Sequence, residues 1–228
     1  MKKLLLLPIL FFAIISSNAQ EDSSFGFTKG DFTISGTMSY SNQDSDSFRT
    51  DIDGNTNTFN TKGRNFNVIP EIGYFITSHL MAGLKVGYKN SKSQNNTSDQ
   101  FSYYSKSRGY SSSVFGRYYF SPQKRISVFI ELNAEFSKIK RDSETLNSNI
   151  DLITSQNTTK TNSIAATPGI NVFINKNLSL TSRIGNLSYD DSKDNFSSSE
   201  GDTGVNRRNG INASISLDNF YFGVLYRI

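Results

Sequence analysis

The 228-residue sequence contains no cysteine, no tryptophan, a single histidine and only four prolines. Without cysteine, the chain has no disulfide framework, no thiolate zinc site and no cysteine nucleophile. After residue 15 the apolar runs are only a few residues long, whereas a transmembrane helix needs about 20 mostly apolar residues. These absences exclude a polytopic helical membrane protein. What remains is a chain rich in serine, threonine and asparagine, which favours strands and polar loops over helices.

The first 19 residues predict an export signal. Lys2 and Lys3 precede a run of about 12 apolar residues, and a small-residue site ending at Ala19 follows the run. The alternative, a short membrane anchor, is disfavoured because the run is too short to span a bilayer. We therefore predict a signal peptide at 1–19 and a mature domain at 20–228. Removing the two lysines lowers the formal net charge from +4 to +2, so the charge gives no argument for nucleic-acid binding.

Apolar residues alternate with polar ones through most of the mature chain. In seven successive segments the apolar residues fall on even numbers: 32–40, 66–76, 80–88, 114–120, 126–136, 164–174 and 178–184. Period-two alternation is typical of strands with one apolar and one polar face. An eighth segment, 211–228, alternates with a phase change at Asp218-Asn219, which predicts a long strand containing a bulge.

The connections between these segments alternate between long and short. The long ones are 41–63, 90–108, 139–162 and 190–209, and the short ones are 77–79, 121–125 and 175–177. This arrangement predicts an all-β fold, an eight-stranded antiparallel transmembrane β-barrel with short periplasmic turns and long extracellular loops. Each segment is long enough to cross a bilayer as a tilted strand, which takes about 9 to 11 residues.

Alternation alone does not decide which face lies inside. A secreted eight-stranded carrier such as a lipocalin would point its apolar residues inward. The odd-numbered face, however, carries few charges and several bulky aromatic residues: Phe75, Phe115, Tyr119, Phe129 and Phe173. These side chains suit a packed interior better than a wet surface, so we predict that the even-numbered face meets lipid.

The sequence contains an internal repeat. The pattern from Pro70 to Leu80 recurs from Pro168 to Leu178 at an offset of 98, and eight positions match when the comparison is extended to Gly87 and Gly185. The repeat predicts two equivalent hairpins on opposite walls of the barrel, the alternative being chance similarity between amphipathic hairpins. The prolines lie in mid-strand, where they remove a ladder donor, so bulges are expected there.

The charges on the odd-numbered face fall at one depth, which predicts an interior charge belt of Glu71, Lys85, Arg117, Glu131 and Arg183. A tight turn with Ile76 opposite Leu80 pairs Glu71 with Lys85. Buried charges must pair because desolvation is costly. The belt is thus a packed polar core or, alternatively, a gate in a narrow ion path.

The neighbouring turn places Arg117 relative to the next strand. If Phe120 lies opposite Ile126, then Arg117 lies opposite Phe129 and diagonal to Glu131.

Four stretches resemble the small outer-membrane β-barrel family of Gram-negative bacteria, the porin-like group related to the OmpA and OmpX barrels. They are 69–76, 115–120, 167–174 and the C-terminal 222–228. The leader, with Asn18-Ala19-Gln20 around the predicted cleavage site, is similar to signal peptides of the Bacteroidetes. The resemblance covers the whole mature chain and implies a location in the cell outer membrane.

The resemblance also assigns a role to the last strand, which in this family is the signal that the barrel-assembly machinery reads. The matching apolar ladder here is Phe220, Phe222, Val224, Tyr226 and Ile228. Ile228 stands where the family usually has Phe.

No catalytic, metal or cofactor site is predicted, and the protein is not expected to be an enzyme. The single His79 falls in a predicted periplasmic turn, away from any acyl-chain pocket that a Ser-His hydrolase would need. The acidic residues near Gly54 lack the spacing of a calcium loop. Tyr103, Tyr104, Lys106 and Arg108 form a basic, aromatic stretch for which an ordinary solvated loop is the favoured interpretation and contact with lipopolysaccharide phosphates the alternative.

The sequence therefore predicts a monomeric outer-membrane barrel with a structural or interaction role in the cell envelope. Its expected partners are membrane lipid, lipopolysaccharide and the assembly machinery, with no nucleic acid. A narrow porin-like channel and a loop-mediated adhesin are the alternative functions.

Overall fold

The computed structural model describes residues 25–50, 56–97, 101–147, 150–214 and 221–228. Within these residues the chain forms ten strands and no helix long and apolar enough to cross a membrane. The strands are β1 (Phe32–Thr50), β2 (Thr56–Phe75), β3 (Leu80–Thr97), β4 (Phe101–Tyr119), β5 (Ile126–Asn147), β6 (Ile150–Phe173), β7 (Leu178–Arg183), β8 (Asn186–Ser198), β9 (Thr203–Ser214) and β10 (Tyr221–Arg227).

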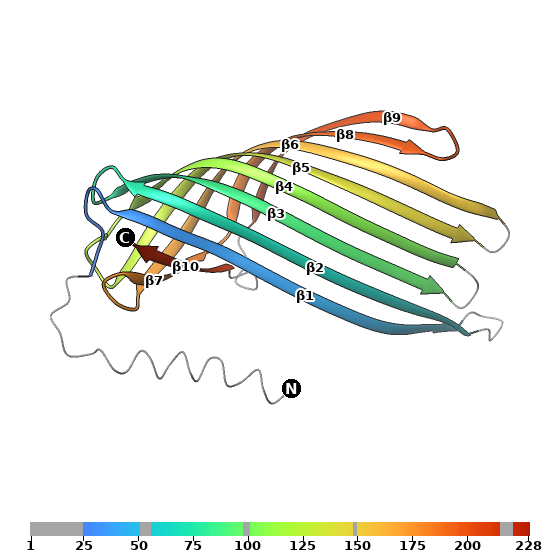
Figure 1. The fold of residues 1–228 in the computed structure, drawn as a ribbon, viewed down its shortest axis with the longest axis horizontal. Coiled ribbons are helices and arrows are strands. Elements are labelled where there is room, and N and C mark those ends of the chain that lie inside the picture. The colour runs from blue at the N-terminus through green and yellow to red at the C-terminus, as the bar shows by residue number, and fades with distance from the viewer. Residues whose placement is uncertain (1–24, 51–55, 98–100, 148–149, 215–220) are drawn as a thin grey trace.

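Eight of these strands close into a ring. Antiparallel pairing runs in the order β5-β4-β3-β2-β1-β10-β7-β6, and β6 pairs back to β5. The segments 76–79, 120–125 and 174–177 connect strands at one end of this ring, which we name the short-turn end. The opposite end, where the long strands rise as hairpins, is the hairpin end (Figure 1). The predicted eight-stranded antiparallel barrel is confirmed.

The last two strands of the barrel are each divided into two segments. β6 pairs with β7 over Gly169–Phe173 and with β8 over Ser155–Ala166, and the register changes by one residue between them. Gly185, at φ 79°, lies in this break, a backbone conformation that glycine adopts without strain. The Ile184 N–H donates to the Pro168 carbonyl at 2.9 Å. A bulge therefore lies opposite Pro168, as predicted.

Pro70 is accommodated differently. The β2–β3 pairing is interrupted between Val68 opposite Tyr88 and Glu71 opposite Lys85. The register is the same on both sides of this interruption, so neither strand has an extra residue there. The bulge predicted at Pro70 is therefore wrong. The bulge predicted at Asp218-Asn219 lies outside the described residues.

The segments predicted to be long loops are mostly strand, and that prediction was wrong about their conformation. The β3–β4 hairpin, for example, pairs continuously from Leu80 opposite Tyr118 to Thr97 opposite Phe101. Beyond the apolar band both faces of the sheet carry polar side chains, so the alternation that marks a strand disappears. The backbone ladder continues because its hydrogen bonds do not depend on that alternation.

Over the residues that the structure describes, the ring closes at the short-turn end alone. β1 pairs with β10 over Thr33–Gly36, and among the described residues no pairing joins β1 to β9. β8 and β9 instead extend the sheet beyond β6, and Figure 1 shows them far from β1 at the hairpin end. The molecule is thus a closed barrel that continues into an open, curved sheet.

The two faces of the strands are distributed as predicted. The odd-numbered aromatic side chains are buried in the lumen: Phe75, Phe115, Tyr119, Phe129 and Phe173. The even-numbered apolar side chains point outward, with Leu84 52% and Val114 57% exposed. Val224 and Tyr226 on β10, and Ile228 directly after it, are likewise exposed. The apolar face is therefore outside, which excludes the lipocalin arrangement.

The N-terminal segment completes the core at the short-turn end. Phe27 is fully buried, and its ring stacks on Phe75 with 4.3 Å between centroids. The rings of Tyr119 and Phe173 each lie 4.8 Å from it. The Phe27 N–H donates to the Pro122 carbonyl at 3.2 Å, which ties the segment to a short turn. Phe27 therefore fills the lumen below the strands.

Candidate functional site

The five predicted belt residues converge inside the closed part of the barrel. Each comes from a different strand, and the period of two directs all five side chains inward. They are Glu71 on β2, Lys85 on β3, Arg117 on β4, Glu131 on β5 and Arg183 on β7. Four of the five are less than 9% exposed, and the side chain of Arg183 is 16% exposed.

Arg117 is the centre of this charge belt. It is completely buried, and its Nη2 lies 2.6 Å from Glu131 Oε2 and 3.2 Å from Glu71 Oε2. A second donor, Nε, reaches Glu131 Oε2 at 3.0 Å, and Nη1 donates to the Tyr119 hydroxyl at 3.0 Å. One guanidinium thus joins two carboxylates from β2 and β5, which are separated by two strands, and its planar fork of donors favours such contacts.

Arg183 and Lys85 complete the network. Arg183 Nη2 lies 2.7 Å from Glu71 Oε1 and 3.2 Å from Glu131 Oε2. The ammonium of Lys85 binds Glu131 Oε1, and Ser35 Oγ donates to Glu71 at 3.2 Å. Three cations therefore surround two carboxylates, and neither carboxylate is left unpaired.

The register of the belt corrects one prediction. Glu71 lies opposite Lys85 as predicted, but Arg117 lies directly opposite Glu131, and Phe129 faces Tyr119. The turn at 121–125 is wider than expected because the Phe120 N–H bonds the Val128 carbonyl, at 3.0 Å, instead of reaching Ile126. A shift of two residues keeps every side chain on its face, so the belt survives the error.

Aromatic rings line the belt. The Arg117 guanidinium lies 4.6 Å from the centroid of the Phe129 ring and 5.3 Å from that of Phe115, and Lys85 Nζ lies 4.7 Å from Phe115. Cations over ring faces are attracted by the ring quadrupole, most strongly where water is excluded. Phe115 lies at the level of the belt, whereas Phe129, Tyr119 and Phe27 seal the lumen on its short-turn side.

Sequence reasoning missed the contribution of Phe27. Its only signal is the pair Phe25 and Phe27 in a polar stretch after the leader, before the first alternating segment. Such a short segment has no periodicity, so only the fold reveals that it enters the barrel.

A small cavity lies on the other side of the belt. Its volume is about 190 Å³, and its inward-facing lining includes Lys89, Ser111, Glu135 and Ser137. Ile69 and Ile139 also line this cavity, so the space between the belt and the hairpin end has a mixed polar and apolar lining. The lumen is therefore mixed in character on the hairpin side of the belt and aromatic on the short-turn side.

The other residues considered for chemistry remain apart. His79 is exposed in a short turn, with its Nδ1 3.0 Å from Ser78 Oγ, and no described carboxylate contacts it. Within the described residues no group of three His, Cys, Asp or Glu side chains could hold a metal ion. Among the C-terminal ladder, Phe220 lies outside the described residues.

The comparisons with known proteins agree with this architecture. A model of the outer membrane protein beta-barrel domain matches residues 7–227. No curated protein matches the chain.

Among solved structures, the outer membrane protein OprG of Pseudomonas aeruginosa is similar, with 14% identity and a TM-score of 0.48 over 89% of this chain and 98% of that one. The ferric yersiniabactin receptor FyuA of Yersinia pestis has 8% identity and a TM-score of 0.39, over 84% of this chain and 44% of the receptor. The transport unit of the autotransporter AIDA-I of Escherichia coli has 13% identity and a TM-score of 0.38, over 93% and 77%.

The family match extends over nearly the whole sequence, and the fold has the outward apolar face and closed strand ring that a lipid environment requires. The chain belongs to the outer membrane protein beta-barrel family and is an integral protein of the cell outer membrane.

Proposed function

We propose that this barrel has a structural or interaction role in the cell envelope and forms no open pore. The observation that carries the proposal is the filled lumen at the short-turn end, where Arg117 is fully buried and Glu131 is 1% exposed. An eight-stranded barrel has an interior just wide enough for side chains. The charge belt and the aromatic residues occupy that width.

Opening the charge belt also requires a large free energy. Removing one partner of a buried ion pair typically costs about 3–5 kcal/mol, because a charge is left without compensation. Glu71 and Glu131 each contact two or more cations, so a transient opening would break several such contacts together. Thermal fluctuations would therefore rarely break the ion pairs of the belt all at once.

The interaction part of the role rests on the hairpin end. Strands β2 to β6 are 18 to 24 residues long, whereas about 9 to 11 residues cross a bilayer. The excess length carries paired, polar strands beyond the apolar band. In this family's orientation those hairpins face the cell exterior, where they offer a broad surface to other envelope components.

A gated narrow channel is the second candidate. It is favoured by the cavity of about 190 Å³ above the belt, whose lining brings charged side chains such as Lys89 and Glu135 close to the seal. In this candidate the belt is a gate whose ion pairs exchange during opening.

Planar-bilayer recording separates the two candidates. We expect no single-channel steps from the wild-type protein, and none from Arg117→Ala or Glu131→Ala. Brief openings in the wild type that become long-lived in these variants would establish the gate instead. Steady wild-type conductance would contradict both. Heat-modifiable gel migration shows in each case that the recorded protein is folded.

The remaining assignments follow the family and the sequence. We propose that residues 1–19 are a signal peptide removed on export and that residues 20–228 form the mature domain. The protein acts as a monomer without a cofactor, is not an enzyme, and presents the β10 strand to the barrel-assembly machinery. A mature N-terminus found by mass spectrometry at a position far from residue 20 would contradict the first of these assignments.

A further inference from the structure

A row of four cations crosses the outer face at the hairpin end. Lys138 on β5 lies opposite Lys160 on β6, Lys160 lies opposite Lys193 on β8, and Lys193 lies opposite Arg207 on β9. Directly paired residues on one face have Cβ atoms about 4.5–5.5 Å apart, and like charges in such pairs destabilise a sheet. We name these four residues the cation row.

The protein itself does not neutralise the cation row. Lys160, Lys193 and Arg207 are exposed, Lys138 is half-buried, and none of the four forms an ion pair with a described residue. Two outward carboxylates are nearby. Asp142 pairs with Lys140 at 3.9 Å. Asp191 lies on the same face of β8 as Lys193, two residues closer to the apolar band. An excess of positive charge remains, and an external anion would relieve it.

The same paired row continues into aromatic residues. Tyr88 on β3 lies opposite Tyr110 on β4, and Tyr110 lies opposite Lys138. Both tyrosines are exposed, at 44% and 55%. Outward tyrosines in an outer-membrane barrel mark the level of the lipid headgroups. The cation row therefore lies where headgroup phosphates lie.

The outer face is hollowed at this level. A depression of about 310 Å³ is lined by Tyr88, Arg108, Tyr110, Lys138, Lys140 and Asp142. Three cations and two tyrosines line it against one carboxylate, Asp142, which pairs with Lys140. The excess of positive donors suits a phosphate group. The basic, aromatic stretch noted in the sequence contributes Arg108 to this depression.

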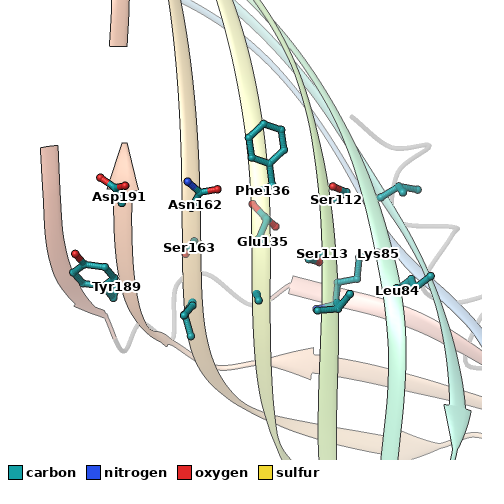
Figure 2. Close-up of a pocket in the computed structure, with 14 residues that line it drawn as sticks. Leu84, Lys85, Ser112, Ser113, Glu135, Phe136, Asn162, Ser163, Tyr189 and Asp191 are labelled. Atoms are coloured by element: carbon teal, nitrogen blue, oxygen red, sulfur yellow. The ribbon is translucent and has the colours of Figure 1, made fainter. Parts of the chain in front are cut away.

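An apolar groove lies directly below, toward the centre of the membrane. It has a volume of about 520 Å³, and the outward side chains that form it include Leu84, Val114, Ala134, Phe136 and Ile164. Figure 2 shows Phe136, Asn162 and Asp191 in one row across neighbouring strands at its upper edge. That row is two residues from the cation row, which corresponds to about 7 Å along the strands.

From this arrangement we propose that the outer face of β3 to β6, β8 and β9 is a binding site for a phosphorylated, acylated glycolipid of the lipopolysaccharide type. Its phosphates lie on the cation row and in the basic depression, and an acyl chain lies in the apolar groove. Four adjacent cations favour a headgroup with more than one phosphate over a phospholipid with a single charge. The site is independent of whether the lumen conducts.

The test uses the full mature barrel in phosphatidylcholine nanodiscs, with bisphosphorylated lipid A as the probe. Each cation near anionic headgroups contributes a factor of about five in affinity. The variant Lys138→Gln/Lys160→Gln/Lys193→Gln is therefore expected to bind the probe about 100-fold more weakly. The matched control Lys29→Gln/Lys124→Gln/Lys176→Gln removes the same charge from exposed positions at the short-turn end and should bind like wild type.

Two further probes identify the occupant. Dephosphorylated lipid A and phosphatidylglycerol should each bind at least tenfold more weakly than bisphosphorylated lipid A. Equal binding of the dephosphorylated probe would overturn the role of the cations. Equal binding of phosphatidylglycerol would make the occupant an ordinary phospholipid, and an equal loss in the control variant would reduce the effect to net charge.

Thermal unfolding guards against a variant that is merely misfolded. Without lipid A, the triple variant should melt at or above the wild-type temperature, because the repulsion in the row is relieved. Lipid A should raise the melting temperature of the wild type and leave that of the triple variant unchanged. The substitution Ala134→Trp fills the groove and should weaken lipid A binding at least fivefold; unchanged binding would show that no acyl chain occupies it.

Discussion

The short-turn end and the hairpin end share strands β1 to β6 but are stabilised in different ways. At the short-turn end eight strands close into a ring around eight buried hydrophobic side chains and the charge belt. At the hairpin end β9 is exposed along nearly its whole length, on both faces. The comparison teaches that backbone ladders can extend a sheet well beyond its core, whereas a core requires that the sheet close on itself.

The hairpin end relies on hydrogen bonds between small polar side chains. Thr159 Oγ1 donates to Asp194 at 2.5 Å, and Arg208 Nη2 lies 2.5 Å from the same carboxylate. Such pairs across strands contribute a few tenths of a kcal/mol to about 1 kcal/mol each. The short-turn end should therefore carry most of the free energy of unfolding.

The largest expected effect comes from the centre of the belt. Arg117→Ala leaves the carboxylates of Glu71 and Glu131 short of their buried partner and should lower the free energy of unfolding by about 3–5 kcal/mol. Urea titration in lipid vesicles, followed by heat-modifiable gel migration, measures the change. The control is Arg141→Ala at the hairpin end, where an exposed arginine bonds Ser107 at 3.2 Å. An equal loss of unfolding free energy in the two variants would contradict the view that the short-turn end carries most of the stability.

The second expected effect tests the aromatic residue that enters from the N-terminal segment. Phe27→Ala removes a fully buried ring in contact with Phe75 and Tyr119 and should cost about 3 kcal/mol in the same titration. Phe196→Ala, at a 45% exposed position on β8, should cost less than about 1 kcal/mol. A Phe27 variant as stable as the Phe196 variant would mean that the segment contributes little to the core.

A smaller effect is expected from close packing inside the ring. A Cβ at Gly83 would lie 2.2 Å from the Ile72 carbonyl oxygen and 2.6 Å from the Phe115 ring, whereas a Cβ at Gly116 meets nothing within 4 Å. Gly83→Ala should therefore destabilise the barrel by about 1–3 kcal/mol, since overpacking forces neighbours to move. Gly116→Ala serves as the matched control, and a loss in that variant of the same size would contradict the steric explanation.

The smallest expected difference lies in native-state dynamics. Amide hydrogens of β9 should exchange faster than those of β3, because few buried contacts support β9. Hydrogen exchange followed by mass spectrometry measures both strands in one experiment. Protection of β9 equal to that of β3 would show that the hairpin end is as cooperative as the ring.

Much of this architecture could be predicted from the sequence because alternation has a physical cause. A face that meets lipid must be apolar, so Leu84 and Val114 identified the outside, and the opposite face identified Glu71 and Arg117 as interior. The belt was predicted even though one register was wrong, because a shift of two residues leaves every face unchanged. Where both faces are polar, apolar and polar residues do not alternate and the sequence does not indicate a strand. For that reason the outer parts of the long strands were predicted to be loops.

The sequence by itself determined the strand class, the number of barrel strands, the lipid-facing side and the charged residues inside. Only the tertiary structure decided which charges touch, how Phe27 fills the lumen, and where the ring ends and the open sheet begins. It also brought Lys138, Lys160, Lys193 and Arg207 into one row, although they are far apart in the chain. The reason is that periodicity is local, whereas register and closure depend on contacts between residues distant in sequence.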